Sequence, residues 1–300
     1  MVKKIFIDCD PGVDDAIALV YAFNQEQFEV VGVSSVSGNV GIDVTTRNLA
    51  HLLPALNCAA TPLIQGYSTP IKRTPTTAEY VHGDDGLGGN FSMIEQVAAV
   101  EPVTNQPSQA MYDCIMAQSE KVAIFALGPL TNVAYLLQDF PEVKTRLSAI
   151  YIMGGGLEKG NITPHAEFNF YVDPEAVAIV LQSRIELHLV SLNVTEQAVI
   201  TDVLLDGLRE IQSNIAQFSA KALARYGEAD ALLHDPLTFM VATHPEWFSS
   251  EQKKFAIDTS ESATRGQLFE DETGGVVYFY TAVQPSVWEH AILEAYRKQK

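Results

Sequence analysis

The sequence is poor in cysteine and lacks a long apolar run. Its three cysteines, Cys9, Cys58 and Cys114, form no Cys-x-x-Cys pair. This spacing favours neither a disulfide framework nor a thiolate zinc site, and it is typical of a reducing compartment. The apolar run near the N-terminus, residues 5–7, is too short for a signal-peptide core, and no run reaches the roughly 18 residues that a membrane helix needs. We therefore expect a cytoplasmic protein without a membrane span.

Basic residues are also scarce. The chain has 19 lysines and arginines against 37 aspartates and glutamates, which gives a net charge of -18. The densest basic stretches are Lys3-Lys4, Lys253-Lys254 and residues 297–300, so no basic patch is indicated. Such a surface repels phosphate backbones and anionic lipids, which argues against a nucleic-acid or membrane partner. The balance fits a neutral small molecule or a cation, although the acidity can also serve solubility alone.

The order of apolar patterns predicts the fold class. The chain has 300 residues, of which 47% are hydrophobic, enough for a large core. Short apolar runs predict buried strands over residues 4–9, 29–36, 121–127, 149–153, 187–192 and 275–283. Helical spacing predicts helices over residues 13–24, 45–56, 130–139, 174–182, 202–226, 236–242 and 287–298. This alternation predicts one α/β domain over residues 1–300, with an open, mostly parallel, doubly wound (Rossmann-like) sheet and helices on both faces.

Four aspartates fall within eight residues at the end of the first predicted strand. The motif is DCDPGVDDA, residues 8–16, in which Pro11 and Gly12 make a sharp turn before the first helix. Carboxylates this close repel one another unless raised pKa values, helix N–H groups or a cation offset the repulsion. Helix capping explains one or two of them, but a helix start has too few free N–H groups for four. Oxygen-only ligands favour a hard cation such as Ca2+ or Mg2+ over zinc.

Other polar residues follow predicted strands or lie in two long loops, residues 66–89 and 154–170. Loops of this length are usually functional. Each residue also has a plain explanation as a turn residue, a surface histidine or a helix cap. Their shared position at strand ends, where such a sheet binds ligands, favours a common site. The residues are Asn39 in SGN, His82 in HGDDGLGG, Asn161, Glu167 and Asn169 in GNITPHAEFN, and His234-Asp235 before Pro236.

Together these motifs resemble the inosine/uridine-preferring nucleoside hydrolase family. The resemblance is carried, in the family's order and over residues 8–236, by DCDPGVDDA, SGN, HGDDGLGG, LGPLTN, IMGGG, GNITPHAEFN and HDP. The first motif combined with a distant HDP is a specific signal. The last 60 or so residues add little to it.

The resemblance implies an activity and roles for individual residues. The activity is hydrolysis of the N-glycosidic bond of ribonucleosides for nucleoside salvage. The implied Ca2+ ligands are Asp10, Asp15, Asp235 and the backbone carbonyl of Leu127. Ribose binding is implied for Asp14, Asn39, Met153, Asn161, Glu167 and Asn169, and Phe168 and His82 are also implied to contact substrate. Asp10 is implied to activate a Ca2+-bound water, and His234 to serve the leaving base.

The chemistry agrees with this assignment. Breaking an N-glycosidic bond builds oxocarbenium character on the ribose, which a negatively lined pocket stabilises. A base is a poor leaving group unless it is protonated or hydrogen-bonded, and a histidine titrates in the useful range. In the family a histidine at the position of His234 accompanies inosine/uridine activity, so the resemblance implies broad or inosine/uridine-preferring specificity. Arg225 and Tyr226 are candidate base contacts that fit a solvated helix face equally well. Family resemblance also implies a homodimer or homotetramer.

Two rival hypotheses remain at this point. An aspartate pair at the end of the first strand also suits a Mg2+-dependent phosphohydrolase. That enzyme needs a lysine or arginine to clamp phosphate, and none lies in the motifs. The second rival is a non-catalytic, cation-dependent nucleoside or sugar binding protein on the same fold.

Overall fold

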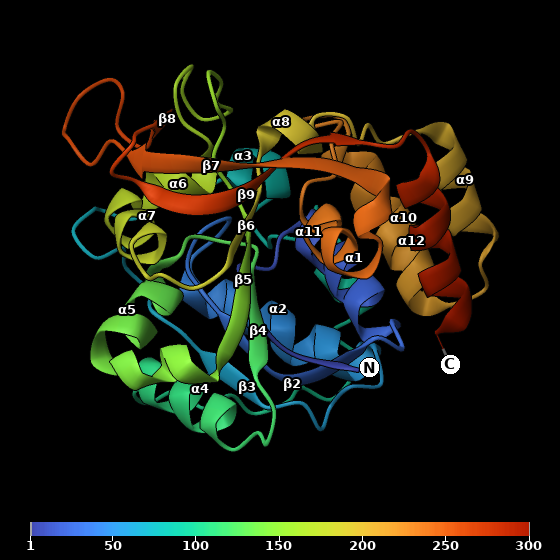
Figure 1. Cartoon of the computed structure of the whole chain (residues 1–300). Helices are drawn as coiled ribbons and strands as arrows, with labels where there is room; N and C mark the ends of the chain where they lie inside the picture. Colours follow the sequence, from blue (N-terminus) through green and yellow to red (C-terminus); the bar gives the residue numbers. More distant parts are fainter. Residues whose placement is uncertain (1, 300) are drawn as a thin grey trace.

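The computed structural model describes residues 2–299, which form a nine-stranded sheet between two layers of helices (Figure 1). The strands are β1 (Lys3–Cys9), β2 (Phe28–Ser35), β3 (Leu63–Gln65), β4 (Val122–Ala126), β5 (Leu147–Met153), β6 (Leu187–Val190), β7 (Phe248–Ile257), β8 (Leu268–Glu270) and β9 (Gly275–Val283). Their order is β3-β2-β1-β4-β5-β6-β9-β7-β8. All pairs from β3 to β9 are parallel, and β7 pairs antiparallel with both β9 and β8. The predicted α/β class with a mostly parallel open sheet is confirmed.

Helices cover both faces of this sheet, as predicted. The α-helices are α1 (Val13–Phe23), α2 (Ile42–Ala55), α3 (Glu79–His82), α4 (Pro107–Met116), α5 (Thr131–Asp139), α6 (Phe168–Val172), α7 (Pro174–Leu181), α8 (Leu192–Thr195), α9 (Asp202–Glu210), α10 (Asn214–Tyr226), α11 (Asp235–Thr243) and α12 (Val287–Lys298). Short 3-10 helices span Phe91–Met93, Pro141–Arg146 and Pro245–Trp247. Helices α4, α5 and α7 pack on one face, and α1, α2 and α9–α12 on the other (Figure 1). None of the helices in residues 2–299 is long and apolar enough to span a membrane.

The central strands are apolar on both sides because both of their faces are covered. On β1, Ile5 and Ile7 belong to one hydrophobic core, whereas Phe6 belongs to the other. The same division holds on β4, where Phe125 faces the first core and Ile124 the second. Successive side chains of a strand point to opposite faces, so a continuous apolar run is what a two-sided core requires.

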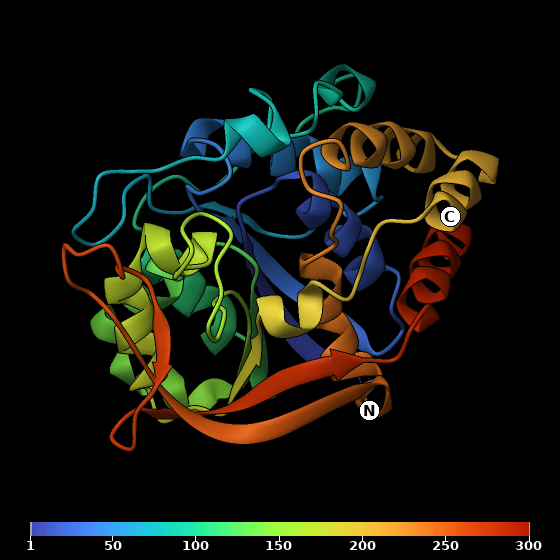
Figure 2. The ribbon, with the colours of Figure 1, turned by 90° about the horizontal axis from the view of Figure 1, so that it is seen from above.

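The strand order fixes the position of a ligand site. Along the chain, the order runs outward in one direction from β1 to β3 and in the other from β4 to β6, so it reverses between β1 and β4. Sheets of this kind bind ligands outside the carboxyl ends of the strands at such a reversal. The two long loops of the sequence lie at this end, and they contain α3 and the start of α6. Figure 2 shows the same arrangement from above, with the antiparallel strands β7 and β9 along one side of the molecule.

Candidate active site

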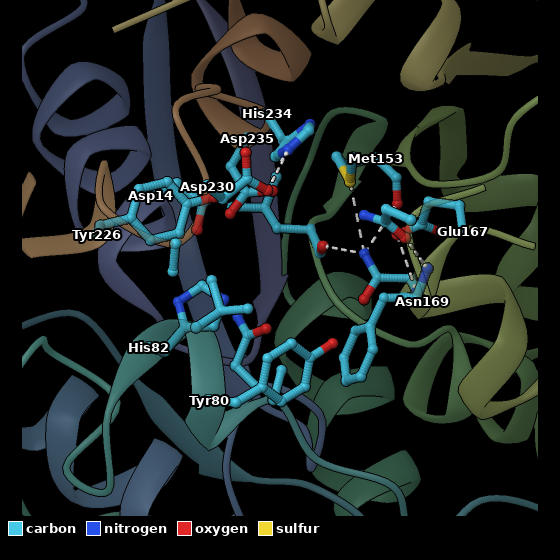
Figure 3. A pocket seen from close by; sticks show the side chains of 17 residues that line it. Asp14, Tyr80, His82, Met153, Glu167, Asn169, Tyr226, Asp230, His234 and Asp235 are labelled. Carbon is cyan, nitrogen blue, oxygen red and sulfur yellow. Dashed lines mark hydrogen bonds and ion pairs between the residues drawn. The ribbon is translucent and has the colours of Figure 1, made fainter. Parts of the chain in front are cut away.

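A pocket opens at the carboxyl ends of the parallel strands (Figure 3). Most of the residues predicted from the sequence line it: Asp14, Asn39, His82, Leu127, Met153, Asn161, Glu167, Phe168, Asn169, His234 and Asp235. Asp10 and Asp15 are not lining residues, and both are fully buried. The strand-end rule therefore gathers residues more than 200 positions apart into one site, whereas their individual roles stay predictions.

Three carboxylates converge at the pocket floor, with Asp14 and Asp235 in the lining and Asp15 fully buried behind it. Asp14, Asp15 and Asp235 each offer an oxygen, and these atoms lie within 4.8 Å of one another. The first two lie in the opening turn of α1, and Asp235 is the first residue of α11. Asp15 is fixed locally because its Oδ2 accepts from the Gly12 N–H at 2.8 Å. A helix capping interaction thus explains Asp15 alone and leaves the other two carboxylates for another purpose.

Asp10 occupies a cradle made by two glycines. Its Oδ2 accepts from the Asn39 backbone N–H at 2.7 Å. A Cβ on Gly38 would lie 2.1 Å from Oδ2 of Asp10, and a Cβ on Gly128 would lie 2.4 Å from its Oδ1. The glycines of the SGN and LGP motifs therefore leave the space that this carboxylate fills. Asp10 also touches the floor cluster, because its backbone N–H donates to Oδ1 of Asp15 at 3.3 Å.

The cluster carries more negative charge than its surroundings compensate. Burial raises the pKa of Asp14 to about 7, and it also raises the pKa values of Asp10, Asp15 and Asp235. For Asp10, Asp14 and Asp235, the neighbouring carboxylates raise the pKa further. The pocket lining within residues 2–299 contains no lysine or arginine. A cation is the natural compensation, and this set of oxygen donors fits a hard divalent ion.

The carbonyl of Leu127 adds a neutral oxygen to the site. Leu127 lines the pocket, and its carbonyl accepts from the Asn169 side-chain amide at 2.7 Å. A carbonyl oxygen has two lone pairs, so this hydrogen bond leaves one for another partner. Its predicted role as a metal ligand is compatible with this geometry.

On the side of the pocket away from the two histidines (Figure 3), backbone N–H groups orient the residues of GNITPHAEFN. Oε2 of Glu167 accepts from Gly155 N–H at 2.8 Å, and its Oε1 accepts from Asn169 N–H at 2.9 Å. Gly155 has φ +70, a conformation that favours glycine. Oδ1 of Asn161 accepts from Phe168 N–H at 2.9 Å. These bonds hold polar side chains along one wall, as recognition of several hydroxyl groups requires.

The two pocket histidines have different electrostatic environments. Nδ1 of His82 accepts from the Val13 backbone N–H at 3.2 Å, so the proton of the neutral ring is on Nε2. Burial lowers the pKa of His82 to about 3. Burial alone would also lower the pKa of His234, but the hydrogen bond to Asp230 and the charges of Asp230 and Asp14 raise it above its ordinary value.

Sequence analysis missed several lining residues. These are Ala78, Tyr80, Val81, Ala229 and Asp230. Tyr226, one of the two candidate base contacts, lines the pocket with its ring 5.3 Å from that of His82. The other candidate, Arg225, is exposed and pairs with Glu228. The one sequence signal for Asp230 was its position four residues before His234.

Comparisons with known proteins point to one family. A family model described as inosine-uridine preferring nucleoside hydrolase matches residues 5–291. The pyrimidine-specific ribonucleoside hydrolase RihA of Salmonella schwarzengrund is 37% identical over 295 residues, which cover 95% of this chain and 92% of the relative. A plant nucleoside hydrolase, PpNRh1, superposes with a TM-score of 0.89 at 25% identity, covering 99% of both chains.

A purine-preferring ribonucleoside hydrolase from Gardnerella vaginalis shares the fold, with a TM-score of 0.88 at 23% identity and 98% coverage of both chains. The family model and the RihA relative set aside the rival hypothesis of a non-catalytic binding protein. The chain belongs to the inosine-uridine preferring nucleoside hydrolase family, and it is a ribonucleoside hydrolase, an N-glycosidase.

Proposed function

We propose that this enzyme hydrolyses the N-glycosidic bond of inosine, uridine and related ribonucleosides for nucleoside salvage, with Ca2+ as its cation. The observation that carries the proposal is a buried group of carboxylates, Asp14, Asp15 and Asp235, at the floor of a pocket that is also lined by two histidines. A ribonucleoside has matching parts: a diol for the floor, a 5′-hydroxyl for the polar wall and a base for the histidines.

The carboxylates stabilise the transition state and activate the nucleophile. Positive charge develops on the ribose as the bond to the base breaks, and a negatively charged floor lowers the energy of that state. Asp10 accepts the proton of the attacking water as general base. Its carboxylate is held between Gly38 and Gly128, so it does not have to reorganise during the reaction.

The cation fits the donor set of the floor. The predicted ligands are Asp10, Asp15, Asp235 and the carbonyl of Leu127, and Asp14 lies within reach of two of them. Held by these residues, Ca2+ would supply a Lewis acid for the vicinal hydroxyls of the ribose and for the attacking water. Because a 2′-deoxyribose lacks one of these two hydroxyls, we expect 2′-deoxyribonucleosides to be poor substrates.

The base leaves from the end of the pocket that carries the histidines. His234 donates a proton to the departing base, which suits its raised pKa. His82 remains neutral and presents its Nε2–H as a hydrogen-bond donor. The ring of Tyr226 adds an apolar surface beside His82. Asn161, Glu167 and Asn169 bind the sugar at the other end.

The first test is release of base and ribose from inosine, uridine, cytidine and adenosine, without added phosphate. We expect release from inosine and uridine that a chelator abolishes and that Ca2+ restores better than Mg2+ or Zn2+. Asp10→Asn should abolish turnover, whereas Asp206→Asn, an exposed position on α9, is the matched control. Release that requires phosphate, or that persists in the metal-free enzyme, would contradict the proposed mechanism.

A second test addresses the rival hypothesis of phosphoryl transfer. Turnover of a phosphate monoester such as p-nitrophenyl phosphate would support the rival phosphohydrolase, and we expect none because the described pocket lining has no basic side chain.

We also propose a homodimer or homotetramer, which light scattering coupled to gel filtration distinguishes from a monomer.

A further inference from the structure

We propose that Thr195 and Asp230 form a clamp that fixes the tautomer and orientation of the His234 ring at the base end of the pocket. The proposal rests on the proposed function, in which His234 acts on the leaving base. Both are positioning residues, since they act through the imidazole. The clamp is the pair of hydrogen bonds that these two side chains make to the two ring nitrogens.

The two bonds hold the ring from opposite sides. Nδ1 of His234 lies 2.8 Å from the Thr195 hydroxyl, and Nε2 lies 3.3 Å from Oδ2 of Asp230. Thr195 is completely buried, whereas the Asp230 side chain is 24% exposed and lines the pocket. Figure 3 shows Asp230 and His234 side by side at the pocket wall. Nε2 is therefore the ring nitrogen directed towards the cavity.

In the neutral form of the His234 ring, Asp230 determines which nitrogen carries the proton. A carboxylate only accepts hydrogen bonds, so Nε2 must carry a hydrogen to make a favourable contact with it. A hydroxyl can donate or accept, so Thr195 remains a partner for Nδ1 whether that nitrogen carries a proton or not. The ring therefore keeps an N–H facing the base end of the pocket. The long Nε2 contact of 3.3 Å leaves this hydrogen available for sharing with an acceptor atom on a base.

The backbone around the clamp fixes the distance between its two sides. Residues 198–200 pair with residues 231–233: Leu233 N–H donates to the Ala198 carbonyl at 2.9 Å, and Ile200 N–H donates to the Ala231 carbonyl at 2.8 Å. Asp230 is itself oriented, because its Oδ1 accepts from Leu232 N–H at 3.1 Å. The segment after α8 and the segment before α11 therefore form one unit, with the ring of His234 held between them.

The experiment compares four variants on two kinds of substrate. Asp230→Ala and Thr195→Val remove one side of the clamp each, and Asp230→Asn and Thr195→Ser each keep a hydrogen-bonding group there. Uridine and inosine need help for the leaving base, whereas p-nitrophenyl riboside does not. We expect Asp230→Ala and Thr195→Val to lower kcat on uridine and inosine about 10- to 100-fold, with KM changed less than about 3-fold. The same variants should retain p-nitrophenyl riboside turnover within about 2-fold.

The rescue variants separate orientation from other effects. We expect Asp230→Asn and Thr195→Ser to recover most of the lost kcat. In parallel, two-bond 1H–15N correlation spectra of histidine-labelled enzyme should show Nε2 of His234 protonated in the wild type and a mixture of tautomers in Asp230→Ala. Equal losses on all substrates, an unchanged tautomer in Asp230→Ala, or Asp230→Asn as impaired as Asp230→Ala would each overturn the clamp. If the wild type released no base from any ribonucleoside, the proposed function would fail, whereas the spectra would still test the clamp.

Discussion

Removing the cation should make stability depend on pH in a direction opposite to ordinary acid denaturation. Most carboxylates stabilise a folded protein when they are ionised, because their folded-state pKa is depressed. Asp14 has the reverse behaviour, since burial first and then the charge of Asp15 raise its pKa from 3.8 to about 7. Between these two values the unfolded chain has released the proton and the folded chain still holds it. The folded metal-free enzyme therefore loses stability as pH rises from about 4 to about 7.

The size of the effect follows from the two pKa values of Asp14. They differ by about three units, which at about 1.4 kcal/mol per unit corresponds to roughly 4 kcal/mol above pH 7. At pH 5 the penalty is less than half of this, because the unfolded group is only about one unit above its own pKa. The loss between pH 5 and pH 8 is therefore roughly 2 to 3 kcal/mol. For a chain of this size, that corresponds to a fall of about 5 °C in Tm.

Differential scanning calorimetry at pH 5 and pH 8, with chelator or with saturating Ca2+, measures this directly. We expect the chelated enzyme to have the lower Tm at pH 8, and Ca2+ to raise Tm more at pH 8 than at pH 5. Asp14→Asn should remove the share of this difference that comes from Asp14, because the amide does not ionise; the raised pKa values of Asp10, Asp15 and Asp235 leave a remainder of the same sign. A chelated enzyme that is more stable at pH 8 than at pH 5 would refute the reasoning, as would an equal gain from Ca2+ at both values.

Three further predictions test the pocket. His234→Ala should lower kcat on inosine at least about 100-fold and spare p-nitrophenyl riboside, and equal losses on the two substrates would remove its leaving-group role. Gly128→Ala should lower kcat more than about 10-fold, because the new Cβ would lie 2.4 Å from Oδ1 of Asp10 and displace it; a crystal structure with that carboxylate unmoved would contradict this. The NMR shifts of His82 should stay constant from pH 5 to 8, because its pKa is lowered to about 3; an inflection in that range would show that the ring is not held neutral.

Sequence patterns predicted those strands and helices that bury an apolar face. The strand over residues 275–283 and the helix over residues 287–298 agree with β9 and α12 at both ends. The helices predicted over residues 202–226 are α9 and α10, which residues 211–213 separate. Strand β7 was missed because its sequence, FSSEQKKFAI, is largely exposed and carries no apolar run. Strands β3 and β8 are three residues each, too short for a periodic signal.

The site likewise contains residues that a local sequence pattern marks and residues that no local pattern marks. Asn39 was predictable because it follows a buried strand, and parallel strands bring their carboxyl ends to one edge of the sheet. Leu127 was named only through the family resemblance. Thr195 and Asp230 were not predictable, because their relation to His234 depends on the pairing of residues 198–200 with residues 231–233. No local pattern marks a pairing between two irregular segments about 30 residues apart. Interactions of this kind depend on tertiary structure, so periodicity does not reveal them.

The two histidines show how much chemistry is decided by such contacts. In the sequence, His82 and His234 are equivalent: each lies in a polar motif, and each has an ordinary pKa near neutrality. In the folded chain, burial lowers the pKa of His82 to about 3, whereas the hydrogen bond and charge of Asp230 raise the pKa of His234 against the effect of burial. A pair of groups whose pKa values are driven apart is suited to two different tasks in one reaction. We therefore expect a neutral donor at His82 and a proton source at His234, so exchanging the two environments would impair base release even with both histidines retained.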